Sequence, residues 1–117
     1  MKNRVALVMG GGAGTGRATV LAFAREGAEV VIADVNEKSG RDTLALVEGQ
    51  GGRGLFVNAD MGNASDVQAV IEQTRQVFGA LHMVSNNAAL GAPNKPVTEL
   101  SEQEWDRCMA VTLRGVW

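Results

Sequence analysis

The sequence predicts an α/β fold in which helices cover both faces of a parallel sheet, a doubly wound arrangement. Three observations support this fold class. Short apolar runs alternate with stretches of helical periodicity along the whole chain. The apolar runs are continuous and do not alternate with polar residues, which is typical of strands buried on both faces. A helix-length stretch separates each run from the next, which is the pattern of repeated strand–helix–strand units.

The first half of the chain predicts two strand–helix pairs. Residues 4–9 form a short apolar run that ends in glycines, and residues 15–26 carry apolar side chains at helical spacing. Residues 29–33 form a second solidly apolar strand. Asn36 has the residue type of a helix N-cap and predicts a helix from there to about Glu48, where a glycine-rich stretch ends it.

The third strand is predicted at residues 55–57, and it is followed by the most regular helix of the chain. That helix has one apolar face, formed by Val67, Val70, Ile71, Val77 and Phe78 together with Thr74. Its start carries Ser65 with Gln68 three residues later. This spacing predicts a capping box at the helix N-terminus.

A fourth strand is predicted at residues 81–85, followed by a loop at 91–96 and a last helix. Ser101 and Glu104 predict a second capping box before that helix, whose apolar residues are Trp105, Met109, Leu113 and Val116. The helical pattern runs to Trp117 without a glycine or a polar tail. The fourth strand would also be an exposed edge of the sheet. We therefore expect the chain to be the N-terminal part of a longer protein.

The composition excludes several classes of partner and site. Lys and Arg number 11 against 13 for Asp and Glu, a net charge of -2, which predicts no nucleic-acid partner. No apolar run approaches the ~20 residues of a membrane span, so no membrane partner is expected. The single cysteine, Cys108, excludes an internal disulfide. The apolar run that follows the basic N-terminus is too short for a signal peptide, so a cytoplasmic protein is expected. The single histidine, His82, has no cysteine or histidine partner, so no metal site is expected.

The strongest site signal is the glycine-rich segment 10–16 between the first strand and the first helix. Free N–H groups and the helix dipole favour an anion at a helix N-terminus, and glycines let a diphosphate approach the backbone. The glycines at 10, 14 and 16 form the pattern G-x-x-x-G-x-G. The common dinucleotide pattern G-x-G-x-x-G fits no frame of this segment.

Two other nucleotide patterns overlap the same glycines. A phosphate-loop reading fails because Arg17 and Ala18 stand where lysine and a magnesium-binding hydroxyl are required. The pattern G-x-G-x-G at Gly12, Gly14 and Gly16 resembles that of S-adenosylmethionine-dependent methyltransferases. A methyltransferase fragment therefore stays open as an alternative, as does a non-catalytic nucleotide-binding module.

Polar residues end the other three strands, at the edge of the sheet where ligands bind in this fold class. Asp34 ends the second strand, where a carboxylate can accept hydrogen bonds from both hydroxyls of a ribose and would repel a 2′-phosphate. Its alternative role is to cap the following turn. Asp60 follows the third strand and could meet an adenine amino group, and Asn86-Asn87 follow the fourth.

Together these four elements resemble the short-chain dehydrogenase/reductase family. The family motif T-G-x-x-x-G-x-G corresponds to residues 9–16, its N-N-A-G motif to Asn86-Asn87-Ala88-Ala89, and its acidic positions to Asp34 and Asp60. The resemblance implies that Gly10, Gly12, Ala13, Gly14, Thr15 and Gly16 contact the cofactor diphosphate. It also implies that Met61 flanks the adenine, and that Asn87, Ala88 and Ala89 contact the ribose beside the nicotinamide.

The chain departs from the family pattern at three positions. Met9 replaces the threonine of the first motif, and Ala89 replaces the last glycine of N-N-A-G. Thr112 stands where the family segment V-N-L-x-G has the asparagine of the catalytic tetrad, so we expect Thr112 at that catalytic position. The other family catalytic residues, a serine and a Tyr-x-x-x-Lys motif, have no counterpart in this sequence, which contains no tyrosine.

The resemblance implies a partial Rossmann-like sheet with strand order 3-2-1-4. Residues 1–117 are then the NAD(P)-binding, N-terminal part of one larger domain. The expected activity of the intact protein is hydride transfer between NAD(H) and a small alcohol or ketone, with NAD preferred over NADP because of Asp34. By family analogy, the intact enzyme is expected to be a homo-oligomer.

Overall fold

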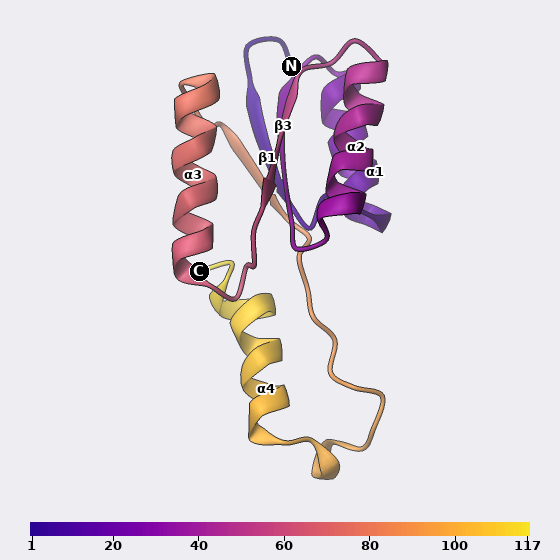
Figure 1. Cartoon of the computed structure of the whole chain (residues 1–117), viewed down its shortest axis with the longest axis vertical. Coiled ribbons are helices and arrows are strands. Elements are labelled where there is room, and N and C mark those ends of the chain that lie inside the picture. Colours follow the sequence, from indigo (N-terminus) through magenta and orange to yellow (C-terminus); the bar gives the residue numbers. More distant parts are fainter.

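A four-stranded parallel sheet with the strand order β3-β2-β1-β4 forms the centre of the molecule (Figure 1). The computed structural model describes all 117 residues. The strands are β1 (Val5–Met9), β2 (Glu29–Asp34), β3 (Gly54–Asn58) and β4 (Met83–Asn86). The α/β fold class and the strand order predicted from the sequence are therefore confirmed. Because β1 and β2 are the two inner strands, they are also the most completely buried.

Helices lie on both faces of the sheet, as Figure 1 shows. On one face lie α1 (Gly14–Arg25) and α2 (Glu37–Gly49), and on the other lies α3 (Ala64–Phe78). A long connection after β4 leads to α4 (Glu102–Met109), which lies beyond the carboxyl ends of the strands. None of the helices combines the length and the apolar character that crossing a bilayer requires.

Successive residues of each inner strand supply the two halves of the core, since their side chains point to opposite faces of the sheet. Leu7 and Val31 pack in one cluster with Val70 of α3. Val8 and Ile32 pack in the other cluster with residues of α1 and α2. This two-sided burial is the physical reason why β1 and β2 have continuous apolar sequences.

The start of α3 differs from the prediction of a Ser65–Gln68 capping box, which was wrong. The N-cap is Asn63, whose side-chain oxygen accepts hydrogen bonds from the backbone N–H groups of Ser65 at 3.0 Å and Asp66 at 3.4 Å. The Gln68 side chain instead donates to Glu72, one turn further along the helix. Asparagine caps at least as well as serine, and here it stands two residues earlier in the chain.

The fourth strand begins at Met83, two residues later than predicted. The backbone N–H of Val5 donates to Nδ1 of the His82 side chain at 3.0 Å, and the His82 N–H donates to the Val5 carbonyl oxygen at 3.0 Å. The imidazole therefore takes the place of a backbone acceptor at the start of the ladder. This contact gives His82 a structural role at the end of the sheet opposite the glycine-rich segment.

The second predicted capping box, at α4, is confirmed. The Glu104 N–H donates to the Ser101 hydroxyl at 3.2 Å, and the Ser101 N–H donates to a Glu104 carboxylate oxygen at 2.8 Å. Lys95 from the preceding loop pairs with the same carboxylate at 2.7 Å. The hydrogen bonds from Lys95 and Ser101 lower the pKa of Glu104 to about 2. These contacts fasten the loop to the start of α4.

The predicted last helix is divided in two in the structure. The α-helical part ends at Met109, and residues Ala110–Arg114 form a π-helical turn. Single π-helical turns inside helices occur frequently at functional sites. This turn contains Val111, which packs into the core cluster under α3, and Thr112, which the sequence singled out.

Candidate functional site

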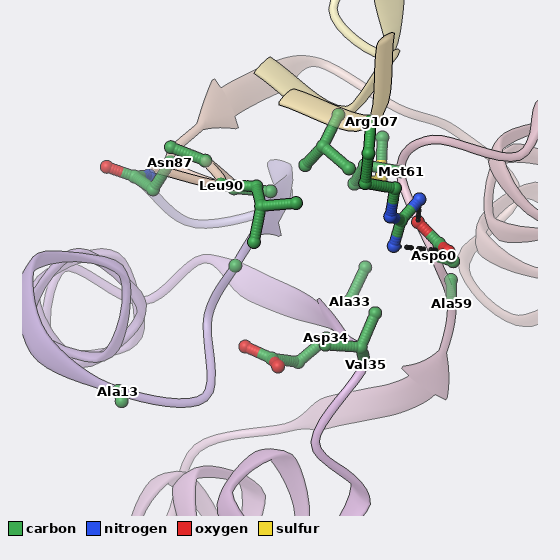
Figure 2. Close-up of a pocket in the computed structure, with 14 residues that line it drawn as sticks. Ala13, Ala33, Asp34, Val35, Ala59, Asp60, Met61, Asn87, Leu90 and Arg107 are labelled. Carbon is green, nitrogen blue, oxygen red and sulfur yellow. Dashed lines mark hydrogen bonds and ion pairs between the residues drawn. The ribbon is translucent and has the colours of Figure 1, made fainter. Parts of the chain in front are cut away.

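A cleft of about 250 Å³ opens at the carboxyl ends of the strands (Figure 2). Its lining comes from the end of β2, from the segments that follow all four strands, and from α4 and the π-helical turn. Of the residues predicted to bind a cofactor, it brings together Gly10, Ala13, Asp34, Asp60, Met61, Asn87, Ala88 and Ala89. Gly12, Gly14, Thr15 and Gly16 belong to the glycine-rich segment but not to this lining, and Thr112 is also outside it.

The glycine-rich segment makes a tight turn from β1 into α1. Gly10 has a φ of +76°, a conformation that glycine adopts without strain. Its backbone also approaches the segment after β4 so closely that an added Cβ would lie 2.7 Å from the Ala88 nitrogen. No side chain caps α1, because its N-cap residue is Ala13. The first turn of α1 therefore keeps the unpaired N–H groups that suit a diphosphate.

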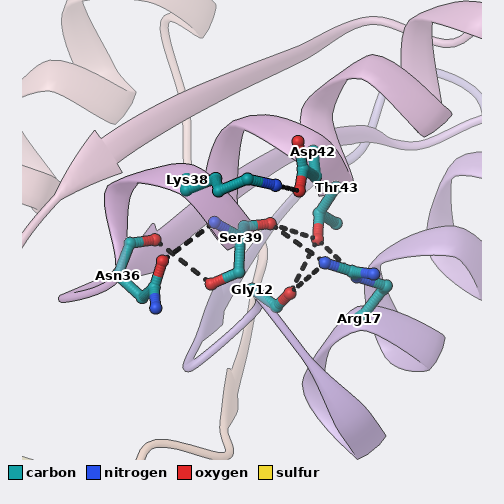
Figure 3. Close-up of polar contacts among 7 residues, drawn as sticks. All are labelled: Gly12, Arg17, Asn36, Lys38, Ser39, Asp42 and Thr43. Carbon is teal, nitrogen blue, oxygen red and sulfur yellow. Dashed lines mark hydrogen bonds and ion pairs between the residues drawn. The ribbon is translucent and has the colours of Figure 1, made fainter.

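A polar cluster behind the turn fixes its shape (Figure 3). The Arg17 side chain donates to the Gly12 carbonyl oxygen at 2.6 Å, to the Ser39 carbonyl oxygen at 3.2 Å and to the Thr43 hydroxyl at 2.9 Å. The fully buried Thr43 hydroxyl in turn lies 3.2 Å from the Gly12 oxygen. Sequence reasoning missed this cluster, because only the fold brings α2 against the loop.

The Asp34 carboxylate lies at the end of β2 and is held by two backbone groups. One oxygen accepts from the Gly12 N–H at 2.8 Å, and the other accepts from the Asn36 N–H at 2.9 Å. Asp34 thus braces the turn into α2 and also lines the cleft, while its binding to a ribose stays a prediction. A carboxylate offers about four acceptor positions, so both oxygens keep room for a further donor.

Asp60 is held by charge as well as by backbone hydrogen bonding. Its carboxylate accepts from the Gly62 N–H at 2.8 Å and from two Arg107 nitrogens at 3.2 Å and 2.8 Å. The hydrogen bond from Arg107 is the largest cause that lowers the pKa of Asp60 below its ordinary value, so the group is ionised at neutral pH. Arg107 was not predicted as a site residue, because it lies 47 positions away on α4.

The segment after β4 joins the first loop. The Asn87 N–H donates to the Met9 carbonyl oxygen at 2.9 Å, and the Asn87 side chain donates to the Ser85 hydroxyl at 2.8 Å. Met9, which replaces the family threonine, is buried with only 4% of its surface exposed and packs in the core cluster under α3. Apolar packing therefore holds this turn where the family uses a hydroxyl.

Thr112 contacts a neighbouring backbone and does not reach into the cleft. The Leu90 N–H donates to the Thr112 hydroxyl at 3.1 Å, and that hydroxyl donates to the Leu90 carbonyl oxygen at 3.3 Å. The hydroxyl proton and one acceptor position are thereby occupied. Thr112 ties the segment after β4 to the π-helical turn, and its catalytic role stays a prediction.

We expect Thr112→Val to loosen this tie, because valine keeps the shape of threonine and removes the hydroxyl. Two exposed hydrogen bonds would be lost, each contributing about 0.5–1.5 kcal/mol. The measurement is hydrogen exchange of the Leu90 amide in the full-length gene product, which should become faster in the variant. Thr112→Ser is the control and should keep the wild-type rate. An unchanged exchange rate in Thr112→Val would contradict the assigned tie.

Comparison with known proteins agrees with this geometry. The family model for short chain dehydrogenases matches residues 4–117. The chain is 43% identical over 117 residues to the short chain dehydrogenase/reductase astE of Aspergillus oryzae, covering 99% of this chain and 45% of that protein. It is 33% identical over 117 residues to a 2,5-dichloro-2,5-cyclohexadiene-1,4-diol dehydrogenase of Sphingobium indicum, covering 100% of this chain and 46% of the relative.

A solved structure of similar fold is that of a double mutant of a Serratia marcescens short-chain dehydrogenase/reductase. It superposes with a TM-score of 0.92 at 32% identity, and the match covers 98% of this chain and 47% of that one. The chain thus spans less than half the length of the relatives it matches. Because the family model matches residues 4–117 and the glycine-rich turn lies at the cleft, we conclude that the chain belongs to the short chain dehydrogenase family.

Proposed function

We propose that this chain is the cofactor-binding part of an NAD-dependent dehydrogenase that interconverts an alcohol and a ketone. When bound, NAD supplies the hydride acceptor, and NADH the hydride donor. The residues of this chain bind and orient the cofactor. The family membership supports the dehydrogenase assignment over the methyltransferase and the non-catalytic alternatives. The full-length gene product, not this chain alone, is expected to carry the activity.

The residue types that line the cleft suit a dinucleotide. At one end, the uncapped start of α1 and the glycine turn suit a diphosphate. Ala59 and Met61, which are both largely buried, add apolar side chains to the lining where an adenine ring would lie. Asn87, Ala88 and Ala89 would then contact the second ribose. Gly12, Gly14, Thr15 and Gly16 would contact the diphosphate at the start of α1.

The position of the Asp34 carboxylate in the cleft is the observation that supports a preference for NAD over NADP. Its two oxygens are oriented by Gly12 and Asn36 and line the cleft. Each can accept a hydrogen bond from one hydroxyl of the adenine ribose. A 2′-phosphate would place a second negative charge beside this carboxylate, and the two like charges would repel each other. The neighbouring residue, Val35, offers no positive charge to offset the repulsion.

The family resemblance assigns proton transfer to a Tyr-x-x-x-Lys motif that these 117 residues do not contain. Thr112 stands at the asparagine position of that catalytic arrangement, and we propose that it supports the site by holding the Leu90 backbone. A small alcohol or ketone is the proposed substrate, in agreement with the name of the diol dehydrogenase relative. A homo-oligomer in the cytoplasm is the proposed context of the full-length enzyme.

Fluorescence titration of the full-length gene product with NADH, NADPH and S-adenosylmethionine tests the proposal. We expect NADH to bind about tenfold or more tightly than NADPH, because one repelled charge or lost charged hydrogen bond is worth about 1.5–3 kcal/mol. Binding of S-adenosylmethionine without binding of NADH would instead support the methyltransferase alternative. Tighter binding of NADPH than of NADH would refute the role of Asp34.

A further inference from the structure

Arg107 reaches from α4 to the cofactor cleft and forms a two-point ion pair with Asp60 there. One guanidinium nitrogen donates to Oδ1 at 3.2 Å and another donates to Oδ2 at 2.8 Å. Figure 2 shows the pair at the rim of the cleft, with Met61 beside it, and both partners belong to the lining. Planar two-point contacts of this kind fix the orientation of a carboxylate as well as its charge.

The backbone next to Asp60 leaves room for this guanidinium. A Cβ added at Gly62 would lie 2.5 Å from an Arg107 nitrogen and 3.2 Å from Oδ1 of Asp60. The Gly62 N–H also donates to that same oxygen at 2.8 Å. Gly62 therefore contributes in two ways, because it binds the carboxylate and lets the arginine approach it. The loop after β3 thus supports the pair, whose side chains are 48% exposed for Arg107 and 34% exposed for Asp60.

Counting acceptor positions shows what the held carboxylate can still bind. Oδ1 accepts from Gly62 and from Arg107, which occupies both of its positions. Oδ2 accepts only from Arg107, so it keeps one free position. Arg107 also favours the ionised form of Asp60, which can accept a hydrogen bond but cannot donate one. The free position therefore suits a single N–H donor and disfavours a carbonyl oxygen.

We propose that Arg107 determines the base specificity of the cofactor site. By orienting Asp60, it presents one acceptor to the exocyclic amino group of adenine and excludes bases that carry a carbonyl oxygen there. This inference rests on the proposed function, since it requires a dinucleotide in the cleft. Arg107 acts through Asp60, so it is a positioning residue. Without it, Asp60 would keep only the Gly62 contact, and the ordering of the carboxylate would have to occur on binding.

The test compares NAD with nicotinamide hypoxanthine dinucleotide, in which a carbonyl oxygen replaces the amino group. Dissociation constants are measured for both on the full-length gene product by calorimetry. Wild type should prefer NAD about tenfold or more, as expected when a site built for a donor at the amino position meets an analogue that carries an acceptor there. In Arg107→Met the preference should fall to about threefold or less, because the loose carboxylate contributes less discrimination. The ratio is internal to each protein, so a partly unfolded sample does not change it.

Two further variants test whether the change in the NAD preference is specific to the Arg107–Asp60 pair. Arg41→Met is the matched control: it also removes an arginine–carboxylate pair, with Glu37 at 2.9 Å on the exposed side of α2, and should keep the wild-type ratio. Gly62→Ala leaves Arg107 intact but displaces its guanidinium, so it should lower the ratio as Arg107→Met does. If Arg107→Met fails to fold, Gly62→Ala alone decides the question.

The outcomes separate this inference from the proposed function. A wild-type ratio retained in both Arg107→Met and Gly62→Ala would refute the role of Arg107 and leave the proposed function standing. Failure of wild type to bind either dinucleotide would refute both. A ratio that falls in both variants and stays unchanged in Arg41→Met would support the inference.

Discussion

Gly16→Ala is expected to abolish dinucleotide binding by the full-length gene product. A Cβ at this position would overlap the Gly10 carbonyl oxygen and lie 2.8 Å from the Gly10 carbonyl carbon. These are backbone atoms, so no flexible side chain can move aside and the turn itself must open. Overpacking of this kind costs about 1–3 kcal/mol of folding free energy. Because the opened turn carries the diphosphate site, affinity for NADH should fall by about 100-fold or more, equivalent to about 3 kcal/mol.

Gly79→Ala is the matched control for this prediction. Gly79 caps the C-terminus of α3 with a φ of +76°, and an added Cβ would meet nothing within 4 Å. The substitution therefore introduces backbone strain of about 1–2 kcal/mol without a clash and outside the proposed cofactor site. Denaturant unfolding and NADH titration of both variants distinguish the two effects. If Gly16→Ala bound NADH as tightly as Gly79→Ala, the close approach of Gly16 to the Gly10 backbone would not govern the site.

Asp34→Ala combined with Val35→Arg is expected to reverse the proposed cofactor preference. The first change removes the carboxylate that would repel a 2′-phosphate, and the second adds a cation at an exposed position of the cleft lining. The carboxylate hydrogen bond that NAD loses and the charged hydrogen bond that NADP forms are each worth about 1.5–3 kcal/mol. The ratio of kcat/KM for the two cofactors should therefore shift by at least about 100-fold toward NADP.

Asp34→Ala alone serves as the intermediate case and should lose much of its NAD preference without acquiring strong use of NADP. It also removes the brace between Gly12 and Asn36, so thermal unfolding has to be measured beside the kinetics. Asp34→Asn removes the charge. It can keep only one of the two backbone contacts, because its amide has a single acceptor oxygen. An unchanged cofactor ratio in the double variant would show that Asp34 does not set the preference.

The sequence was sufficient to predict the layout of the sheet and the location of the cleft. Continuous apolar strands and intervening helices implied a parallel sheet, and the family resemblance implied the strand order that is observed. Since parallel strands end at a common edge, polar residues after each strand could be assigned to one site without knowing any distance. For that reason the cleft contains Asp34, Asp60 and Asn87 as expected. Local patterns were less reliable where two capping residues competed, as Asn63 and Ser65 do at α3.

The features that could be predicted from the sequence depend on neighbouring residues: strand and helix periodicity, the glycine turn and the polar strand ends. The distant side chains that complete the site became visible only in the folded chain. Arg107 meets Asp60 across 47 positions, Arg17 braces Gly12 against α2, and Thr112 holds the Leu90 backbone across 22 positions. The reason is that local spacing fixes only which face of an element a side chain occupies. Its partner is fixed by how the elements pack.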